Sequence, residues 1–363
     1  MPVKNGGGSP VTVAFSGGKD STAAILLLRE QGYEVRALTM RLGLTNEDEK
    51  LAKIETLARA LSVPWQVSDL RNVFKKKVLR YFLDAYRTGL TPNPCVVCNR
   101  QVKFGLLLAE AEKNSHGGLF ASGHYADKVC LEGPEGPRGG PFRSPTRGGR
   151  WFLKEPIDRR KSQIYFLAMI EPTVLEKVIF PIAALTISQV RAKVAGLPLA
   201  NPDESQDVCF LQGENLGAYL SRHLPESFKA GDIVDRCGNR IGRHQGAIHF
   251  TVGQRRGTGH ASDRRLYVVG RDLAANTVML GDEKDLLSRS LTVKTPVFWR
   301  PLEVGEKVTV KVRYQLHGHE ARISEASPAL IRAVFKEPVR AVTPGQFAVF
   351  YDNDIIVAAG EIS

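Results

Sequence analysis

The feature that most constrains the fold is a glycine-rich turn between an apolar strand pattern and a helix pattern. The run Val11 to Phe15 is typical of a buried strand, and the run Ala23 to Leu28, followed by Gly32, is typical of a helix with its C-terminal stop. Ser-Gly-Gly-Lys-Asp-Ser at 16–21 joins them. The two glycines let the backbone approach an anion, and the N-terminus of the following helix favours negative charge. The turn therefore predicts a phosphate site.

The glycine spacing excludes two better-known phosphate loops. The pattern G-x-x-x-x-G-K-[ST] needs a wider spacing, and G-x-G-x-x-G needs a third glycine. The hexapeptide instead resembles the loop of ATP pyrophosphatases, which cleave ATP between the α and β phosphates and so adenylate a carbonyl oxygen. Asp20, inside the loop, suits Mg²⁺ that is bound mainly by phosphate oxygens. An ordinary Gly-Gly turn capped by Ser or Asp is the alternative interpretation.

Strand and helix patterns alternate through the first two hundred residues, which predicts an α/β fold with a parallel sheet and helices on its faces. In such sheets ligands lie off the carboxyl ends of the strands. Met40 ends the strand pattern that begins at Val35, so it should face the same crevice as the loop. A further strand pattern, Leu119 to Ser122, ends in Gly123, which allows close approach to a nucleotide.

Short strands and turns replace this alternation beyond Gly213. They predict a small, hairpin-rich mixed or β domain. From about Leu291, alternating apolar runs separated by turns predict a C-terminal antiparallel β-barrel. We therefore expect three domains, at residues 1–212, 213–288 and 289–363.

Charge and cysteine usage bound the partners and the compartment. Fifty Lys and Arg against 38 Asp and Glu give a formal net charge of +12, which favours a polyanionic partner such as RNA. Five cysteines in 363 residues are too few and odd in number for a disulfide scaffold, and they fit a reducing compartment. The sequence has neither an apolar signal core nor a run of about 18 apolar residues, so we expect a cytoplasmic protein.

A Cys-x-x-Cys pair, Cys95 and Cys98, follows the stiff approach Thr-Pro-Asn-Pro at 91–94 and opens a helix pattern. The field of the helix N-terminus predicts a lowered thiol pKa and hence a nucleophile or a ligand. A zinc site would need a second pair of ligands, and the remaining cysteines, Cys130, Cys209 and Cys237, are each solitary. Two inert buried cysteines remain an alternative.

Several motifs in this order resemble one family, the tRNA-specific 2-thiouridylases, over nearly the whole chain. They are Phe-Ser-Gly-Gly-Lys-Asp-Ser at 15–21, Thr-Pro-Asn-Pro-Cys-Val-Val-Cys-Asn at 91–99, Gly-His-Tyr at 123–125, Cys209-Phe210, Val-Gly-Gln-Arg-Arg-Gly at 252–257 and Ala-Val-Thr-Pro-Gly-Gln at 341–346.

The resemblance implies roles for individual residues. Catalysis falls on Cys98 as nucleophile, on Cys209 as the persulfide-bearing cysteine and on Asp20. ATP contacts fall on Ala14, Phe15, Ser16, Gly17, Gly18, Lys19, Asp20, Ser21, Met40 and Gly123. Contacts to the target base or to the rest of the tRNA fall on Asn93, Pro94, Cys95, His124, Lys161, Ser162, Gln163, Arg313, Tyr314 and Gln346.

The reaction implied is thiolation of the wobble uridine of tRNA. ATP with Mg²⁺ adenylates O2 of the base, a persulfide on Cys209 attacks C2, and Cys98 releases the sulfur. A sulfur-donor protein or persulfide carrier is the implied partner. Alternatives stay open at this point: a [4Fe–4S] cluster on Cys95, Cys98 and Cys209, another tRNA base as target, or an RNA-binding protein without catalysis.

Overall fold

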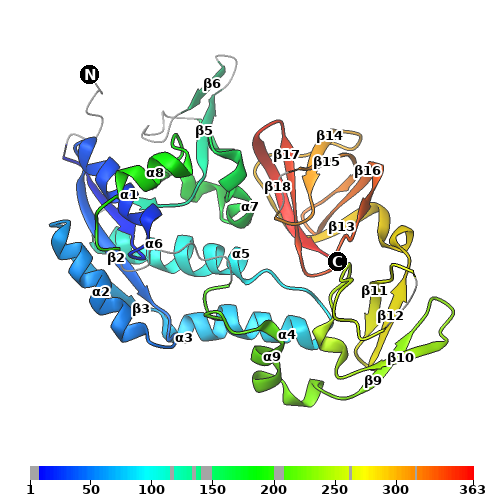
Figure 1. Cartoon of the computed structure of the whole chain (residues 1–363). Coiled ribbons are helices and arrows are strands. Elements are labelled where there is room, and N and C mark those ends of the chain that lie inside the picture. The colour runs from blue at the N-terminus through cyan, green and yellow to red at the C-terminus, as the bar shows by residue number, and fades with distance from the viewer. Residues whose placement is uncertain are drawn as a thin grey trace.

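The computed structural model describes residues 8–114, 118–132, 136–139, 149–199, 208–260, 264–314 and 317–363. The first part of the chain forms a five-stranded parallel sheet in the order β3-β2-β1-β4-β8 (Figure 1). Its strands are β1 (Pro10–Ala14), β2 (Glu34–Arg41), β3 (Trp65–Asp69), β4 (Leu119–Ser122) and β8 (Val178–Ile179). The central strand β1 is the apolar run before the glycine-rich turn, so that turn leaves the middle of the sheet. The predicted α/β parallel-sheet fold is confirmed.

Helices connect and cover these strands. They are α1 (Lys19–Glu30), α2 (Glu47–Ala60), α3 (Arg71–Phe74), η1 (Lys75–Leu79), α4 (Arg80–Arg87), α5 (Pro94–Cys98), η2 (Asn99–Leu107), α6 (Leu108–Asn114), α7 (Ile164–Leu167) and α8 (Ile187–Lys193). Two of these segments, η1 and η2, are π-helical, while η3 (Arg159–Lys161) and η4 (Pro172–Glu176) are 3₁₀ turns. Figure 1 shows α4 and α5 between the parallel sheet and the β-rich part of the molecule.

The second unit is a four-stranded mixed sheet in the order β10-β9-β12-β11. Two hairpins build it, and the parallel pairing of β9 with β12 joins them. This is the predicted hairpin-rich unit, and the helix α9 precedes it. The elements are α9 (Leu216–His223), η5 (Pro225–Ser227), β9 (Gly231–Val234), β10 (Arg240–His244), η6 (Ala247–His249), β11 (Tyr267–Asp272), β12 (Thr277–Gly281) and η7 (Glu283–Leu286).

The third unit confirms the predicted antiparallel barrel. Its first strand pairs with β16 on one side and with the last strand, β18, on the other, so six strands close on themselves. Inward side chains alternate with exposed ones, as β15 shows, because successive residues of a strand face opposite sides. The strands are β13 (Leu287–Phe298), β14 (Lys307–Lys311), β15 (His319–Ala326), β16 (Leu330–Arg340), β17 (Phe347–Asp352) and β18 (Ile355–Ile362).

Three strands that precede the barrel in the chain, β5, β6 and β7, extend the barrel sheet. Strand β7 (Arg150–Lys154) pairs with β18 through Lys154 and Ile355, and β5 (Asp127–Glu132) and β6 (Gly136–Gly139) continue the sheet. The sequence patterns place these strands before residue 212, in the first unit, yet their hydrogen bonding makes them part of the nine-stranded sheet.

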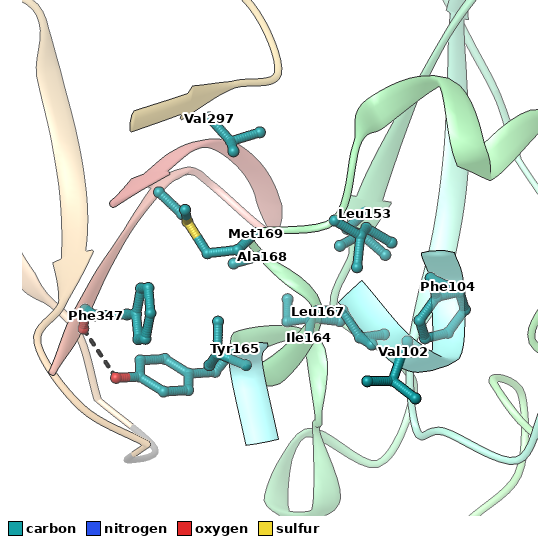
Figure 2. Close-up of a cluster of buried hydrophobic side chains, with 14 of the residues drawn as sticks. Val102, Phe104, Leu153, Ile164, Tyr165, Leu167, Ala168, Met169, Val297 and Phe347 are labelled. Carbon is teal, nitrogen blue, oxygen red and sulfur yellow. Dashed lines mark hydrogen bonds between the residues drawn. The ribbon is translucent and has the colours of Figure 1, made fainter. Parts of the chain in front are cut away.

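One continuous core joins the units. It includes Leu38 of the parallel sheet, Ile248 of the second unit and Phe347 of the barrel. Figure 2 shows the Tyr165 hydroxyl donating to the Phe347 carbonyl oxygen, at 2.8 Å. The buried Trp299 Nε1 likewise donates to the Ala168 carbonyl at 3.1 Å. Over the part of the chain described, no helix has the length and apolarity needed to cross a membrane.

Candidate active site

The glycine-rich turn is held by bonds within itself. Gly17 has φ 72°, in the left-handed region that favours glycine. The Ser21 hydroxyl accepts from the Ser16 N–H at 3.3 Å and donates to the Gly18 carbonyl at 3.0 Å. Gly18 is the N-cap of α1 and supplies no side-chain cap, so the positive end of the helix dipole lies at the turn and favours an anion there. The turn has the chemistry of a phosphate site.

The end of β4 packs directly against this turn. A Cβ on Gly123 would lie 2.7 Å from the Asp20 carbonyl carbon and from the Ser21 nitrogen, so only glycine fits there. The Tyr125 hydroxyl donates to Asp20 Oδ1 at 3.2 Å. The resemblance implies that Gly123 contacts ATP, and the close contact that the structure shows is with the loop backbone.

Met40 lies at the same edge of the sheet. Ala14 pairs in register with Leu38, and the Phe15 N–H donates to the Leu38 carbonyl at 2.9 Å. Met40 therefore stands two residues beyond the point where β1 gives way to the loop. It is partly buried, and its side chain packs against the large core.

The cysteines come from two distant segments. Cys95 and Cys98 lie on α5, which Asn93 caps by accepting from the Val96 N–H at 3.4 Å. Both are partly buried, whereas Cys209, which follows the first unit's last helix, is exposed to solvent. Phe210 and Leu211, directly after Cys209, lie in the same hydrophobic core against which Cys98 packs, so the fold brings the two segments together. In agreement with this, charge on Cys209 raises the pKa of both other thiols.

The predicted lowering of the thiol pKa is wrong. Burial raises the pKa of Cys95 to about 11 and that of Cys98 to about 12. The pKa of Cys209 is also raised, because the surrounding protein removes part of the water around its thiol even though the residue keeps solvent-exposed surface. Repulsion between the thiolates adds to the effect for Cys95 and Cys98. Burial removes water that would stabilise the charged thiolate. This loss of stabilisation is larger than the stabilisation that the N-terminus of the short helix α5 supplies.

Lys103 is a functional candidate to which the sequence patterns assigned no role. The positive charge of Lys103 lowers the pKa of Cys95, Cys98 and Cys209, and so acts against the increase in pKa that burial causes. It lies in η2, the π-helical segment that continues α5. π-Helical segments are rare and recur at functional sites, but the periodicity of apolar residues in a sequence does not predict them. The signal that could have found it is a lysine placed five residues after a reactive cysteine.

The three thiols do not form a ready metal site. Within the described ranges, no group of three or more His, Cys, Asp or Glu side chains is arranged so that it could hold a metal ion. Cys95, Cys98 and Cys209 are therefore not arranged as ligands of a single metal ion, and we derive no step through an iron–sulfur cluster.

Three of the residues assigned to tRNA lie beside the segment that packs on the loop, two of them buried and the third, Gln163, partly buried. His124 is buried, its Nδ1 lies 2.7 Å from the Ser122 hydroxyl, and burial holds its pKa well below the ordinary value. Ser162 is buried as well. Gln163 Oε1 accepts from the Tyr125 N–H at 2.9 Å, and its own N–H donates to the Tyr125 carbonyl at 2.8 Å. These contacts fix the backbone beside Asp20.

Of the other assigned residues, Pro94 is buried in α5, Asn93, Cys95 and Gln346 are partly buried, and the rest lie toward the surface. Arg313 and Tyr314 are exposed, and the Tyr314 ring packs 4.6 Å from that of Phe166. Lys161 is partly exposed on η3. Gln346 Nε2 donates to the Thr91 carbonyl at 2.8 Å, close to the cysteine motif.

Comparisons with known proteins agree along the chain. Family models match residues 9–213 (tRNA methyl transferase HUP domain), 217–282 (tRNA methyl transferase PRC-barrel domain) and 288–362 (aminomethyltransferase beta-barrel domain). The chain is 37% identical to tRNA-specific 2-thiouridylase MnmA of Acetivibrio thermocellus, over 97% of this chain and 98% of that protein. It is 35% identical to tRNA-specific 2-thiouridylase MnmA of Treponema denticola, over 97% of each.

Proposed function

Because the chain belongs to the tRNA-specific 2-thiouridylase family, we propose that it is an ATP-dependent tRNA sulfurtransferase that converts the wobble uridine to 2-thiouridine. The products are thiolated tRNA, AMP and pyrophosphate. The observation that carries the proposal is the joint presence, in the first unit, of a phosphate loop at the sheet edge and of Cys98 in the same packed core as Phe210, the neighbour of Cys209. The matched family models also support three domains at 1–212, 213–288 and 289–363.

The loop is proposed to bind ATP through residues 14–21, with Met40 beside the adenine. The N-terminal end of α1 and the left-handed Gly17 suit phosphate oxygens. Asp20 is the loop carboxylate, and Mg²⁺ held mainly by phosphate oxygens would use it as a protein ligand. There the ion would neutralise phosphate charge. Tyr125 orients Asp20 through its hydroxyl.

The proposed chemistry balances in three steps. O2 of uridine attacks the α-phosphorus and pyrophosphate leaves, so the base carries AMP. The terminal sulfur of a Cys209 persulfide attacks C2 and AMP leaves. The Cys98 thiolate then attacks the Cys209 sulfur, which forms a Cys98–Cys209 disulfide and leaves sulfur on C2. A thiol reductant reopens the disulfide, and a sulfur-donor protein or persulfide carrier reloads Cys209.

The exposure of Cys209 supports its assignment as the persulfide-bearing cysteine and that of Cys98 as the nucleophile. A donor must reach the cysteine it loads, and Cys209 is exposed while Cys98 is partly buried. Binding of tRNA would draw on the surface residues Lys161, Arg313 and Tyr314, by phosphate contact and by stacking. Free cysteines throughout and a tRNA substrate suit a reducing compartment, and we propose the cytoplasm.

The test is a thiolation assay after anaerobic purification. Protein freed of iron is given unmodified tRNA, ATP, Mg²⁺ and a persulfide donor, and AMP and 2-thiouridine are measured. Formation of both supports the proposal. ATP turnover without 2-thiouridine would contradict the proposal and favour another base as the target. Binding of tRNA without ATP turnover would contradict it and favour a non-catalytic RNA-binding protein. Thiolation only after iron and sulfide are restored would overturn the persulfide route.

A further inference from the structure

The segment Gly89 to Thr91 connects α4 to the proline-cysteine motif, and all three units of the chain hold it. Within the first unit, α4 ends in a Schellman motif. The Gly89 N–H donates to the Tyr86 carbonyl at 3.2 Å, and the Leu90 N–H donates to the Ala85 carbonyl at 2.8 Å. Gly89 has φ 78°, so the turn requires glycine.

The second unit contributes Arg271, on strand β11. Its Nε and Nη2 donate to the Gly89 carbonyl at 3.2 and 3.0 Å, and Nη2 also donates to the Leu90 carbonyl at 2.9 Å. On the other side, Nη1 donates to the Phe250 carbonyl of its own unit. Among the residues that the structure describes, Arg271 forms no ion pair. The positive charge of Arg271 is therefore stabilised by carbonyl groups, including those that follow the C-terminal end of α4, where a cation is favoured.

The third unit holds the same segment from another direction. The Thr91 N–H donates to the Pro344 carbonyl at 3.0 Å, and Gln346 Nε2 donates to the Thr91 carbonyl at 2.8 Å. A Cβ on Gly345 would lie 2.8 Å from Leu90 Cβ and from the Thr91 nitrogen. Both polar backbone groups of Thr91 are thus bound by the barrel unit.

Little freedom separates this junction from the cysteines. Pro92 and Pro94 fix two of the backbone dihedrals between Thr91 and Cys95, and Asn93 caps α5. A displacement of Thr91 is therefore passed on to the start of α5.

We propose that Arg271 is a positioning residue for sulfur transfer: by clamping Gly89, Leu90 and Thr91 it fixes α5 and the Cys95–Cys98 pair relative to the nucleotide loop. The inference rests on the proposed function. It predicts that loosening the clamp separates the two half-reactions, because the loop lies on β1 and α1, away from the junction, while the cysteines follow it directly.

The experiment compares Arg271→Gln with Arg243→Gln. Arg243 is exposed on β10, so its replacement removes the same charge from the same unit without touching the junction. With saturating persulfide donor and tRNA, we expect the thiolated product formed per AMP to fall at least about tenfold in Arg271→Gln. The ratio is the readout, because Asn93 to Cys95 are also assigned to the tRNA and the AMP rate can change with them. Arg243→Gln should keep the wild-type ratio. An unchanged ratio in Arg271→Gln, or an equal fall in AMP and product, overturns the proposal.

A second readout needs no tRNA. Alkylation of Cys95 and Cys98 by iodoacetamide is followed by peptide mass spectrometry, with the exposed Cys237 as internal reference. We expect alkylation of both to accelerate at least about threefold in Arg271→Gln, because the clamped segment opens more often. Unchanged rates contradict the proposal.

Gly345→Ala provides an independent variant, because it presses on Leu90 and Thr91 from the barrel side and leaves Arg271 intact. It should give the same loss of product per AMP and the same faster alkylation, and it decides the matter if Arg271→Gln does not fold. A wild-type protein that makes neither AMP nor 2-thiouridine would instead refute the proposed function, with the alkylation rates still testing the clamp.

Discussion

The nucleotide loop and the cysteine site differ in how the chain builds them. Residues 15–21 form the loop within one strand–turn–helix unit. The bonds of Ser21 join residues no more than five positions apart, and the more distant partners of the loop, Leu38 and Tyr125, belong to the same first unit. The cysteine site combines α5 with Cys209, and its entry segment is fixed by Arg271 and Gln346 from two other units. The comparison teaches that the adenylating half of the site is local, whereas the sulfur-transfer half depends on the assembly of the whole chain.

The largest expected effect is the loss of thiolation when one of the two reacting cysteines is replaced. Cys98→Ala and Cys209→Ala should each lower thiolation at least about 10³-fold, because each removes a reacting sulfur. AMP formation should stay near the wild-type rate, since the loop does not depend on either thiol. Single-turnover assays of both products test this, with Cys237→Ala as an exposed control. Parallel loss of AMP would show that the two halves are not separable.

Gly123→Ala attacks the local half instead. The new Cβ would lie 2.7 Å from the backbone of Asp20 and Ser21, so the loop must shift. We expect AMP formation to fall roughly 10²-fold, by analogy with other small misplacements of reacting groups. The matched control is Gly270→Ala, whose Cβ would meet nothing closer than Met279 Cβ at 4.0 Å. Normal AMP formation by Gly123→Ala would contradict the proposed loop geometry.

Lys103→Met tests the electrostatics of the cysteine half. Lys103 now lowers the pKa of all three thiols, so its removal raises each pKa further. The thiolate fraction at a given pH falls, and the rising limb of the thiolation rate moves to higher pH. We expect about a tenfold loss of the thiolation rate at neutral pH, with recovery as the pH increases. Lys113→Met, exposed on α6, is the control; a pH profile unchanged in Lys103→Met would refute this role.

The smallest expected effect distinguishes the two sulfur routes. Cys95→Ser should lower thiolation less than about threefold, which is under about 1 kcal/mol of transition-state stabilisation, because the persulfide route needs only Cys98 and Cys209. Removal of Cys95 also takes a like charge away from Cys98. Rates, iron and acid-labile sulfide are measured on the same anaerobic preparation. Loss of activity together with iron and sulfide would establish a cluster instead.

Much of the fold was predictable because its signals are local. Apolar periodicity located the strand before the loop and the alternation of the barrel strands β14, β16 and β17, and glycine spacing located the phosphate turn. The extension of the barrel sheet by β7 was not predictable, since it depends on the pairing of Lys154 with Ile355, far apart in the chain. The sign of the cysteine pKa shifts was missed for the same reason: burial comes from packing of distant segments.

The sequence alone determined the parts whose physics acts between near neighbours: the strand–turn–helix loop, the proline-stiffened approach to Cys95 and the three-part order of the chain. Only the tertiary structure decided which groups share an environment. It brought Cys209 near Cys98, raised their pKa by burial, set Lys103 against that effect and clamped Gly89 to Thr91 with Arg271. Solvation and hydrogen-bond partners depend on what the folded chain places nearby, and no local pattern encodes that.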